Sequence, residues 1–205
     1  MRTRHVIDSM GGLCIIGGLA LLLVFSGCSS GAELKKLPVG SVMPNFTLKD
    51  FTGKEHSLEQ LKGKIVVLDF CSHKCPWSRG ADKTLPELAK TYGEKDVVFL
   101  GIDSHKSTPP EEIKEYAAEQ KILHPILKDV ENQYADAVGA TRTPEFYILD
   151  KELKLAYHGA FDDRKAPDKP GENNHVRNAL DDLLAGQPVK NPKVDAWGCT
   201  IKRAR

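Results

Sequence analysis

Two cysteines, Cys71 and Cys75, stand close together in the chain, with His73 and Lys74 between them. A cysteine thiolate is a strong nucleophile, and the fraction of thiolate at neutral pH depends on the surroundings of the sulfur. Cys75 directly precedes a predicted helix, where free backbone N–H groups and nearby positive charge favour the thiolate over the thiol. The sequence therefore predicts a reactive thiol at Cys75, and disfavours a buried structural cysteine there.

The five cysteines of the chain fall into separate classes. Cys14 lies within an N-terminal apolar run, and Cys28 directly follows it. Cys71, Cys75 and Cys199 remain, an odd number that leaves at least one thiol free, reactive, metal-bound or paired with another molecule in an oxidising compartment. This count indicates redox or metal chemistry and argues against a disulfide-stapled scaffold.

The N-terminus has the pattern of an export signal. Arg2, Arg4 and His5 precede an apolar run from Leu13 to Phe25, which is shorter than the roughly 20 residues of a spanning helix and is followed by small residues. Residues 1–27 are therefore predicted to be a signal peptide. The cleavage could be that of a lipoprotein, directly before Cys28, or that of an ordinary signal peptide nearby, and the segment could also stay uncleaved as an N-terminal anchor. Each of these three alternatives delivers the domain to an extracytoplasmic compartment.

The segment Ser26-Gly27-Cys28 resembles the lipobox of bacterial lipoproteins, with Phe25 where that family usually carries leucine. The resemblance implies that Cys28 is lipidated. The small and polar composition of the residues that follow, which end in Pro38 and Gly40, predicts that residues 28–40 form a tether. We therefore expect a membrane-anchored lipoprotein on the periplasmic side of the cell envelope, in contact with the membrane through its N-terminal lipid.

The charge balance argues against a nucleic-acid partner. The full chain has 29 basic and 28 acidic side chains, and removal of residues 1–27 leaves 27 of each. A chain without net charge or a basic run has no electrostatic attraction for nucleic acid, so no nucleic-acid partner is expected. The remaining length suits one domain.

The hydrophobic pattern predicts how Cys75 is positioned. The continuous apolar run 65–70 is typical of a strand buried on both faces, and the helix predicted at 76–92 follows it directly. In α/β sheets, chemistry gathers at the carboxyl ends of strands, which is where residues 70–75 fall. The other expected elements are a short strand or hairpin at 45–53, a helical turn at 57–61, a strand at 97–102, a helix at 109–120, a short strand or loop at 126–127, a helix at 131–138, a hairpin at 145–158, a surface loop at 161–172 and a helix at 173–184.

This order of elements predicts an α/β sandwich with a mixed sheet. The domain is expected to span residues 41–186, and residues 187–205, which include Cys199, are expected to form an irregular C-terminal tail.

The segment 63–78 resembles the active-site segment of thioredoxin-fold redoxins. The resemblance implies a thioredoxin-like three-layer α/β/α sandwich with a mixed central sheet. Within it, Cys75 takes the position of the nucleophilic cysteine, and Asp69 that of the buried acid that handles the proton. Ser78 stands where these proteins carry the second, resolving cysteine, so the usual dithiol cannot form there.

Two later motifs resemble the same family. Thr143-Pro144 matches the cis-proline turn that faces the active-site sulfur and receives a substrate chain, and residues 197–203, with Cys199, resemble the tail of the peroxiredoxin-like (AhpC/TSA-type) branch. By this resemblance Ser72 takes the hydroxyl position of the peroxidatic motif, while the proline position of that motif is occupied by Leu68.

Two further side chains are candidates for contact with the substrate. Arg142 could polarise a peroxide, although an exposed loop arginine is more often simply solvated. Trp77 is expected to shape a contact surface for a substrate chain or to pack against the next helix.

The leading hypothesis is an antioxidant or thiol–disulfide oxidoreductase without a bound cofactor. Cys75 attacks a protein disulfide or a peroxide, forming a mixed disulfide or a sulfenic acid, and a second thiol resolves it. Cys71 is near in sequence and Cys199 has the family precedent, and the sequence does not choose between them. The physiological reductant is not identified either.

Two other functions remain open. Cys71, Cys75 and a histidine such as His158 could bind copper, because Cys-x-x-x-Cys-Pro on such a fold resembles copper metallochaperones, although in those proteins the first cysteine takes the nucleophile position. The oxidoreductase hypothesis assigns no metal to the protein. The substitution at Ser78 also keeps open a binding module that has lost turnover.

Overall fold

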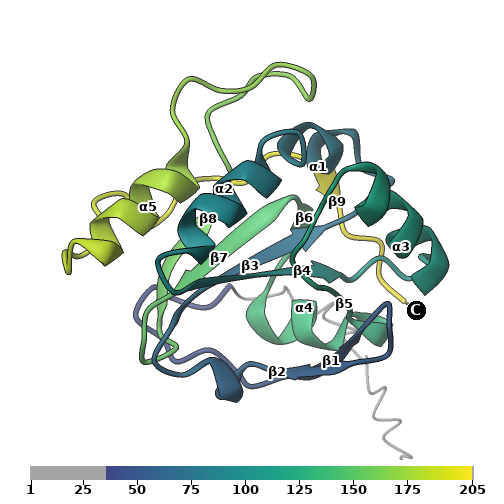
Figure 1. Ribbon diagram of the computed structural model, residues 1–205, viewed down its shortest axis with the longest axis horizontal. Coiled ribbons are helices and arrows are strands. Elements are labelled where there is room, and N and C mark those ends of the chain that lie inside the picture. Colours follow the sequence, from purple (N-terminus) through teal and green to yellow (C-terminus); the bar gives the residue numbers. More distant parts are fainter. Residues whose placement is uncertain (1–35, 205) are drawn as a thin grey trace, which may run out of the picture. The chain divides into compact units, whose positions relative to one another are not determined.

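A computed structural model describes residues 36–204 of the chain (Figure 1), so the predicted signal peptide and Cys28 lie outside the described residues. The central sheet has seven strands in the order β2-β1-β5-β4-β3-β7-β8. Their bounds are β1 (Thr47–Asp50), β2 (Glu55–Ser57), β3 (Ile65–Cys71), β4 (Val97–Asp103), β5 (Ile126–Lys128), β7 (Glu145–Leu149) and β8 (Leu155–Gly159). Two further strands, β6 (Arg142–Thr143) and β9 (Cys199–Thr200), pair only with each other within the described chain.

Strand β3 lies at the centre of this sheet and carries the cysteine loop at its end. Every residue of β3 is buried, as its continuous apolar pattern predicts. It pairs parallel with β4 and antiparallel with β7, so the sheet is mixed. Hydrogen bonds to β4 and β7 hold both edges of β3, so the loop that follows its carboxyl end is attached to a rigid part of the sheet.

Helices cover both faces of the sheet and make three layers. One face packs against α1 (Pro76–Ala81), α2 (Leu85–Gly93) and α5 (His175–Leu184), with α3 (Pro110–Glu119) over a smaller apolar cluster beside them. The opposite face packs against α4 (Gln133–Val138), where Tyr134 stacks on Phe70 of β3. Short 3-10 turns precede β3 at Glu59–Leu61 and α4 at Val130–Asn132. The predicted three-layer α/β/α sandwich with a mixed sheet is confirmed.

The single helix predicted at 76–92 is wrong, because the structure has two helices there. Helix α1 ends at Ala81, and α2 begins at Leu85 with Pro86 in its first turn. Proline has no backbone N–H to donate to the carbonyl four residues earlier, and it disfavours helical geometry at the residue before it. Asp82 follows α1 directly at this break, and its buried side chain lines a cavity together with Asp69 and Cys71.

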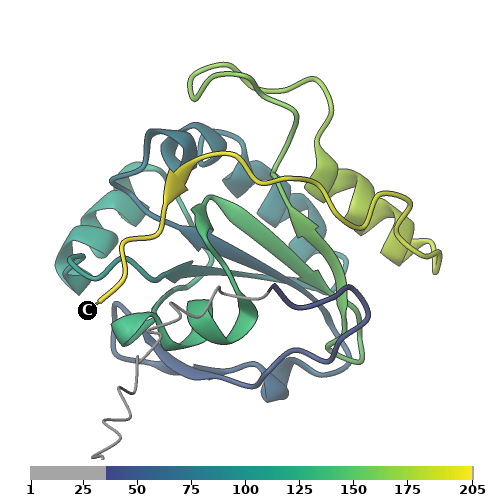
Figure 2. The same ribbon diagram turned by 180° about the vertical axis from the view of Figure 1, so that it is seen from behind.

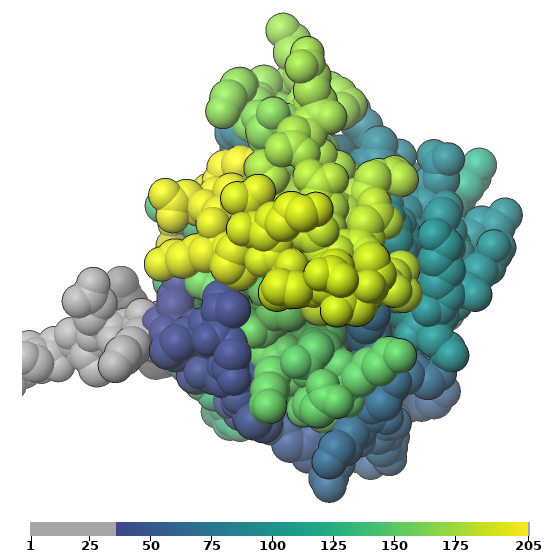
Figure 3. All heavy atoms as spheres, turned by 90° about the vertical axis from the view of Figure 1, so that its left-hand side faces the viewer, coloured from purple at the N-terminus to yellow at the C-terminus, as the bar shows by residue number. Residues whose placement is uncertain are grey.

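The tail predicted to be irregular contains an ordered strand. Figure 2 shows the tail running from the end of α5 to β9, and Figure 3 shows the yellow atoms of the tail on the surface of one side of the molecule. The His158 N–H donates to the Pro192 carbonyl, the Val194 N–H donates to the His158 carbonyl, and β9 pairs with β6. A two-residue strand has no periodicity of its own, so only its long-range pairing reveals it.

No helix within residues 36–204 is long and apolar enough to cross a membrane.

Candidate functional site

The loop from β3 to α1 places the Cys75 sulfur beside the start of a helix. Cys75 is the N-cap residue of α1, with an extended backbone, and Pro76 is the first helical residue. The Cys75 N–H donates to the Ser72 carbonyl at 2.9 Å, and the Cys75 carbonyl accepts from the Arg79 N–H at 3.0 Å. The loop is closed by backbone hydrogen bonds on both sides of the cysteine, so the sulfur has a fixed starting position.

The Cys75 sulfur is surrounded by hydrogen-bond donors. The residue is only 3 % exposed, and its thiol donates to the Thr143 carbonyl at 2.9 Å. Burial raises the pKa of the Cys75 thiol, but hydrogen bonds from the Cys199 side chain, the Ser78 N–H and the Thr143 side chain lower it further than burial raises it. The net pKa lies below that of an ordinary cysteine, so this geometry favours the nucleophilic thiolate.

Strand β9 presents Cys199 to this sulfur. In the antiparallel pair of β6 and β9, Cys199 lies opposite Thr143, the same residue whose carbonyl accepts from Cys75. Burial, followed by the interaction of its thiol with the Cys75 sulfur and by the negative charge of Cys75, raises the pKa of Cys199 to about 11. The β6–β9 ladder therefore brings a thiol that ionises readily together with a second thiol that stays protonated beside it.

Cys71 lies in a different environment. Its side chain belongs to an apolar cluster with Ile113, Ala117 and Ile126, between the sheet and α3. Burial and the carboxylates of Asp69, Asp82 and Asp103 raise the pKa of the Cys71 thiol well above its usual value. A thiol held in its protonated form is a poor nucleophile.

Two buried acids lie beneath the cysteine loop. Asp69 and Asp82 are 3 % and 4 % exposed and line one small cavity together with Cys71. The Tyr116 hydroxyl donates to Asp82 at 2.6 Å, whereas one carboxyl oxygen of Asp69 has no hydrogen-bond partner. Burial, the charge of Asp82 and the charge of Cys75 raise the pKa of Asp69 well above its usual value. These effects favour the protonated form of the Asp69 carboxyl group.

The second acid predicts a pH dependence of stability. Burial raises the pKa of Asp82 from 3.8 to about 6 in the folded state, against the lowering effects of Tyr116 and Arg164. The folded protein therefore binds more protons than the unfolded chain between these values, and the contribution of Asp82 to stability is present below 3.8 and is lost as the pH rises through about 6. We expect Asp82→Asn, which keeps an acceptor for Tyr116, to stabilise the reduced protein at pH 7.5 by up to about 3 kcal/mol and to have little effect at pH 4.

Urea unfolding of both proteins across this pH range measures the difference directly. The wild type serves as the reference at each pH, so the titration of groups that do not interact with Asp82 cancels. An equal difference in unfolding free energy at all pH values would show that Asp82 is not buried with a raised pKa.

The other residues predicted for the site are distributed around this pair of thiols. Trp77 packs on Trp197 of the tail, with ring centroids 5.1 Å apart. The Arg142 guanidinium donates to the Gly198 carbonyl at 3.3 Å and to the Thr200 hydroxyl at 3.4 Å, so it contacts β9. Thr143-Pro144 is a cis peptide bond, as the resemblance implies.

Two serines support the cysteine loop itself. The Ser78 hydroxyl accepts from the Ser72 N–H at 3.2 Å, and the Ser72 hydroxyl accepts from the Lys74 N–H at 3.3 Å. Both serines are buried. At the position where a second cysteine would stand, Ser78 therefore stabilises the loop through its hydroxyl and lowers the pKa of Cys75 through its N–H.

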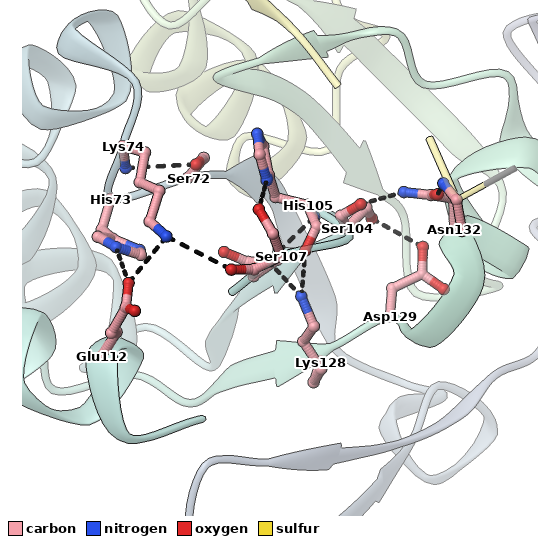
Figure 4. Close-up of polar contacts among 12 residues, drawn as sticks. Ser72, His73, Lys74, Ser104, His105, Ser107, Glu112, Lys128, Asp129 and Asn132 are labelled. Carbon is pink, nitrogen blue, oxygen red and sulfur yellow. Dashed lines mark hydrogen bonds and ion pairs between the residues drawn. The ribbon is translucent and has the colours of Figure 1, made fainter. Parts of the chain in front are cut away.

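A polar rim follows the ends of the neighbouring strands β3, β4 and β5 (Figure 4). His73 and Lys74 both reach Glu112 of α3, at 3.0 and 2.9 Å. Lys128 is paired with Asp103 at 2.7 Å. Further along the rim, the Ser104 hydroxyl donates to Asp129, and Asn132 donates to the Ser104 carbonyl. These contacts join the loops at the ends of the strands, and they leave the His73 ring hydrogen-bonded to Glu112.

The residues of the copper alternative are not brought together. Cys71 faces the apolar cluster under α3 and Cys75 faces Thr143, whereas His158 lies on β8, two strands away from β3. Across residues 36–204, no group of three or more His, Cys, Asp or Glu side chains could hold a metal ion.

Sequence reasoning missed a buried ion pair that anchors the tail. Arg164 donates two hydrogen bonds to Asp162, both at 2.8 Å, and its guanidinium lies 5.1 Å from the Trp197 ring centroid. The Trp197 indole N–H donates to the Asp162 carbonyl at 2.8 Å. The pair lies in the segment predicted as a surface loop, and its charged composition masks the burial. Trp197, a large aromatic residue in the tail, was the one available indication that the tail packs against the domain.

Comparison with known proteins places this geometry in context. The model of the AhpC/TSA family matches residues 39–158. The thiol-disulfide oxidoreductase ResA of Bacillus cereus is 27 % identical over 146 residues, which cover 70 % of this chain and 80 % of that protein.

Solved structures give the same picture. A crystal structure of an uncharacterized conserved protein from Geobacillus kaustophilus is 34 % identical, with a TM-score of 0.77, over 82 % of this chain and 93 % of that one. The peroxidoxin BcpB of Mycobacterium tuberculosis, 22 % identical with a TM-score of 0.58 over 73 % of this chain and 97 % of that one, shares the fold. The thioredoxin-like fold predicted from the sequence is confirmed.

Proposed function

This chain belongs to the AhpC/TSA family, and we propose that within it the protein is an extracytoplasmic thiol–disulfide oxidoreductase with Cys75 as nucleophile and Cys199 as resolving thiol. The similarity to ResA thiol-disulfide oxidoreductases supports the general class of reaction. One observation carries the choice of residues: Thr143 accepts a hydrogen bond from the Cys75 thiol and is also paired with Cys199 in the β6–β9 ladder.

The first step is an attack by the Cys75 thiolate on a sulfur of a substrate disulfide. A new bond forms between Cys75 and that sulfur, the substrate S–S bond breaks, and its electron pair leaves with the second substrate sulfur as a thiolate. The lowered pKa of Cys75 supports this role, because it provides thiolate at neutral pH.

The second step resolves the mixed disulfide. Once Cys75 is bonded to substrate, its negative charge no longer raises the pKa of Cys199, and the nearby Arg142 continues to lower it. Cys199 can then ionise and attack the Cys75 sulfur, which releases the reduced substrate and leaves a Cys75–Cys199 disulfide. Asp69 is suited to take up or return the proton. A dithiol reductant of unidentified source completes the cycle, and no cofactor is required.

The predicted lipid on Cys28 would hold this cycle at the membrane, on the periplasmic side of the cell envelope. A compartment without a cytoplasmic thiol pool permits the disulfide to persist between turnovers.

Disulfide mapping tests the proposal. After mild oxidation with a small excess of diamide, followed by proteolysis and mass spectrometry, we expect a Cys75–Cys199 linkage in the wild type. The same linkage should form in Cys71→Ser, which is the control because it removes the thiol that competes with Cys199 for the resolving role. A Cys71–Cys75 linkage would assign the resolving role to Cys71, and a Cys75 that stays reduced would contradict the proposal as a whole.

Peroxide is the second candidate for the oxidant of Cys75. It would form a sulfenic acid, which Cys199 converts to the same disulfide with release of water. Comparing the rates of disulfide formation with hydrogen peroxide and with a small disulfide such as oxidised glutathione decides between them. Failure of both substrates to react would favour a binding module that has kept the fold without turnover.

A further inference from the structure

Strand β6 is a short edge whose pairing partner is the chain's own tail. Thr143 of β6 lies opposite Cys199 of β9, and the Ile201 N–H donates to the Thr141 carbonyl at 3.0 Å, which extends the pairing by one residue. An extended polypeptide that pairs with β6 and reacts with Cys75 has to bring its own sulfur to the place beside Cys75 that Cys199 now occupies. The resident strand therefore shows which backbone shape this edge accepts.

The residue before the cysteine is the most restricted part of that shape. A Cβ atom added to Gly198 would lie 2.2 Å from the Thr143 carbonyl oxygen, 2.9 Å from the Thr143 carbonyl carbon and 3.3 Å from Cδ of Pro144. These are backbone and ring atoms of the cis-proline turn, which cannot move aside as a flexible side chain could. Gly198 also has a φ of +121°, a conformation that residues with a side chain rarely adopt.

Anchors on both sides hold the resident strand in this register. Before Cys199, the Trp197 indole N–H donates to the Asp162 carbonyl at 2.8 Å. After it, Ile201 is buried in the main core cluster. Cys199 is thus presented on a fixed strand between two attachment points, and a competing chain has to displace that strand.

We propose that the β6 edge is a selective docking site for an extended polypeptide in which glycine directly precedes cysteine, with β9 as its resident occupant. The inference rests on the proposed function, since it concerns which polypeptide thiols and disulfides can reach Cys75. A chain with any larger residue before its cysteine meets the Thr143 carbonyl and cannot dock in this register. The site therefore discriminates in favour of Cys199 and against most cysteines of other proteins.

A set of matched peptides tests the selectivity. Each peptide has the tail sequence Asp-Ala-Trp-Xaa-Cys-Thr-Ile-Lys, with Gly, Ala or Val at Xaa, and its cysteine is joined to thionitrobenzoate. In the full chain carrying Cys199→Ser, the Cys75 thiolate attacks the peptide sulfur, forms a Cys75–peptide disulfide and expels the coloured thionitrobenzoate anion. We expect the Gly peptide to react at least about tenfold faster than the Ala and Val peptides, because a forced overlap with backbone costs roughly that factor or more.

A second variant tests whether the tail is the occupant. Adding Trp197→Ala to Cys199→Ser removes one anchor of β9, and the Gly peptide should then react several-fold faster. Mass mapping locates each adduct on Cys75, and circular dichroism verifies that both variants are folded. Equal rates for the three peptides, or no acceleration on loosening the tail, would overturn the inference.

The small reagent dithiobis(nitrobenzoate) separates this inference from the proposed function. It needs no strand pairing, so it reports only the nucleophilicity of Cys75. Modification of Cys75 by this reagent without discrimination among the peptides would refute the selective edge alone. An unreactive Cys75 would refute the proposed function together with it.

Discussion

Replacement of Cys199 by serine is expected to lower steady-state turnover with a disulfide substrate by at least about 100-fold, because a resolving thiol fixed beside its target acts at a very high effective concentration. Cys199 lies in the β6–β9 ladder opposite Thr143, whose carbonyl accepts from the Cys75 thiol. Serine preserves the size of the side chain and can still donate a hydrogen bond, but it cannot form the disulfide. The first attack by Cys75 should therefore survive, and the protein should accumulate as a mixed disulfide with its substrate.

Rapid-quench mass spectrometry and a coupled turnover assay measure the two steps separately. Cys71→Ser is the matched control, and we expect it to keep more than about half of wild-type turnover, since Cys71 is held protonated in an apolar cluster. Full turnover in Cys199→Ser, or its loss in Cys71→Ser, would transfer the resolving role to Cys71.

Removal of the Asp162 carboxylate should have the largest effect on stability. The Asp162 and Arg164 side chains are 3 % and 0 % exposed and are joined by two hydrogen bonds of 2.8 Å. Asp162→Ala leaves the buried guanidinium without its hydrogen-bonded carboxylate, and loss of one partner of such a pair costs about 3–5 kcal/mol of unfolding free energy. Urea unfolding of the reduced protein, with linear extrapolation to water, measures this loss.

A double variant separates the cost of the unpaired charge from a loss of packing. In Asp162→Ala with Arg164→Met no charge remains buried, so we expect it to recover at least about half of the lost free energy. Methionine also fills part of the space between α1 and Trp197, which the guanidinium now occupies. A loss below about 1 kcal/mol in the single variant, or no recovery in the double one, would show that the pair is not desolvated.

Much of the fold was predictable because its signals are local. The apolar run of β3, the hairpin of β7 and β8, and the helices α3 and α5 follow from short-range periodicity, and the structure has each of them close to its predicted position. The break between α1 and α2 was missed although Pro86 was visible, because the apolar pattern continues through it. The burial of Asp82 and of the Asp162–Arg164 pair gave no signal, since charged residues in a sequence resemble a solvated surface.

The sequence by itself determined that Cys75 would stand between a buried strand and a helix, and that serine occupies the place of its usual partner. It could not decide between Cys71 and Cys199, because nearness along the chain says little about where two side chains point. The tertiary structure made that distinction: Cys71 follows the alternation of β3 into the apolar cluster beneath α3, whereas β9 returns from the far end of the chain to lie against β6. Strand pairing between distant segments depends on the packing of everything between them, and no local pattern at Cys199 carries that information.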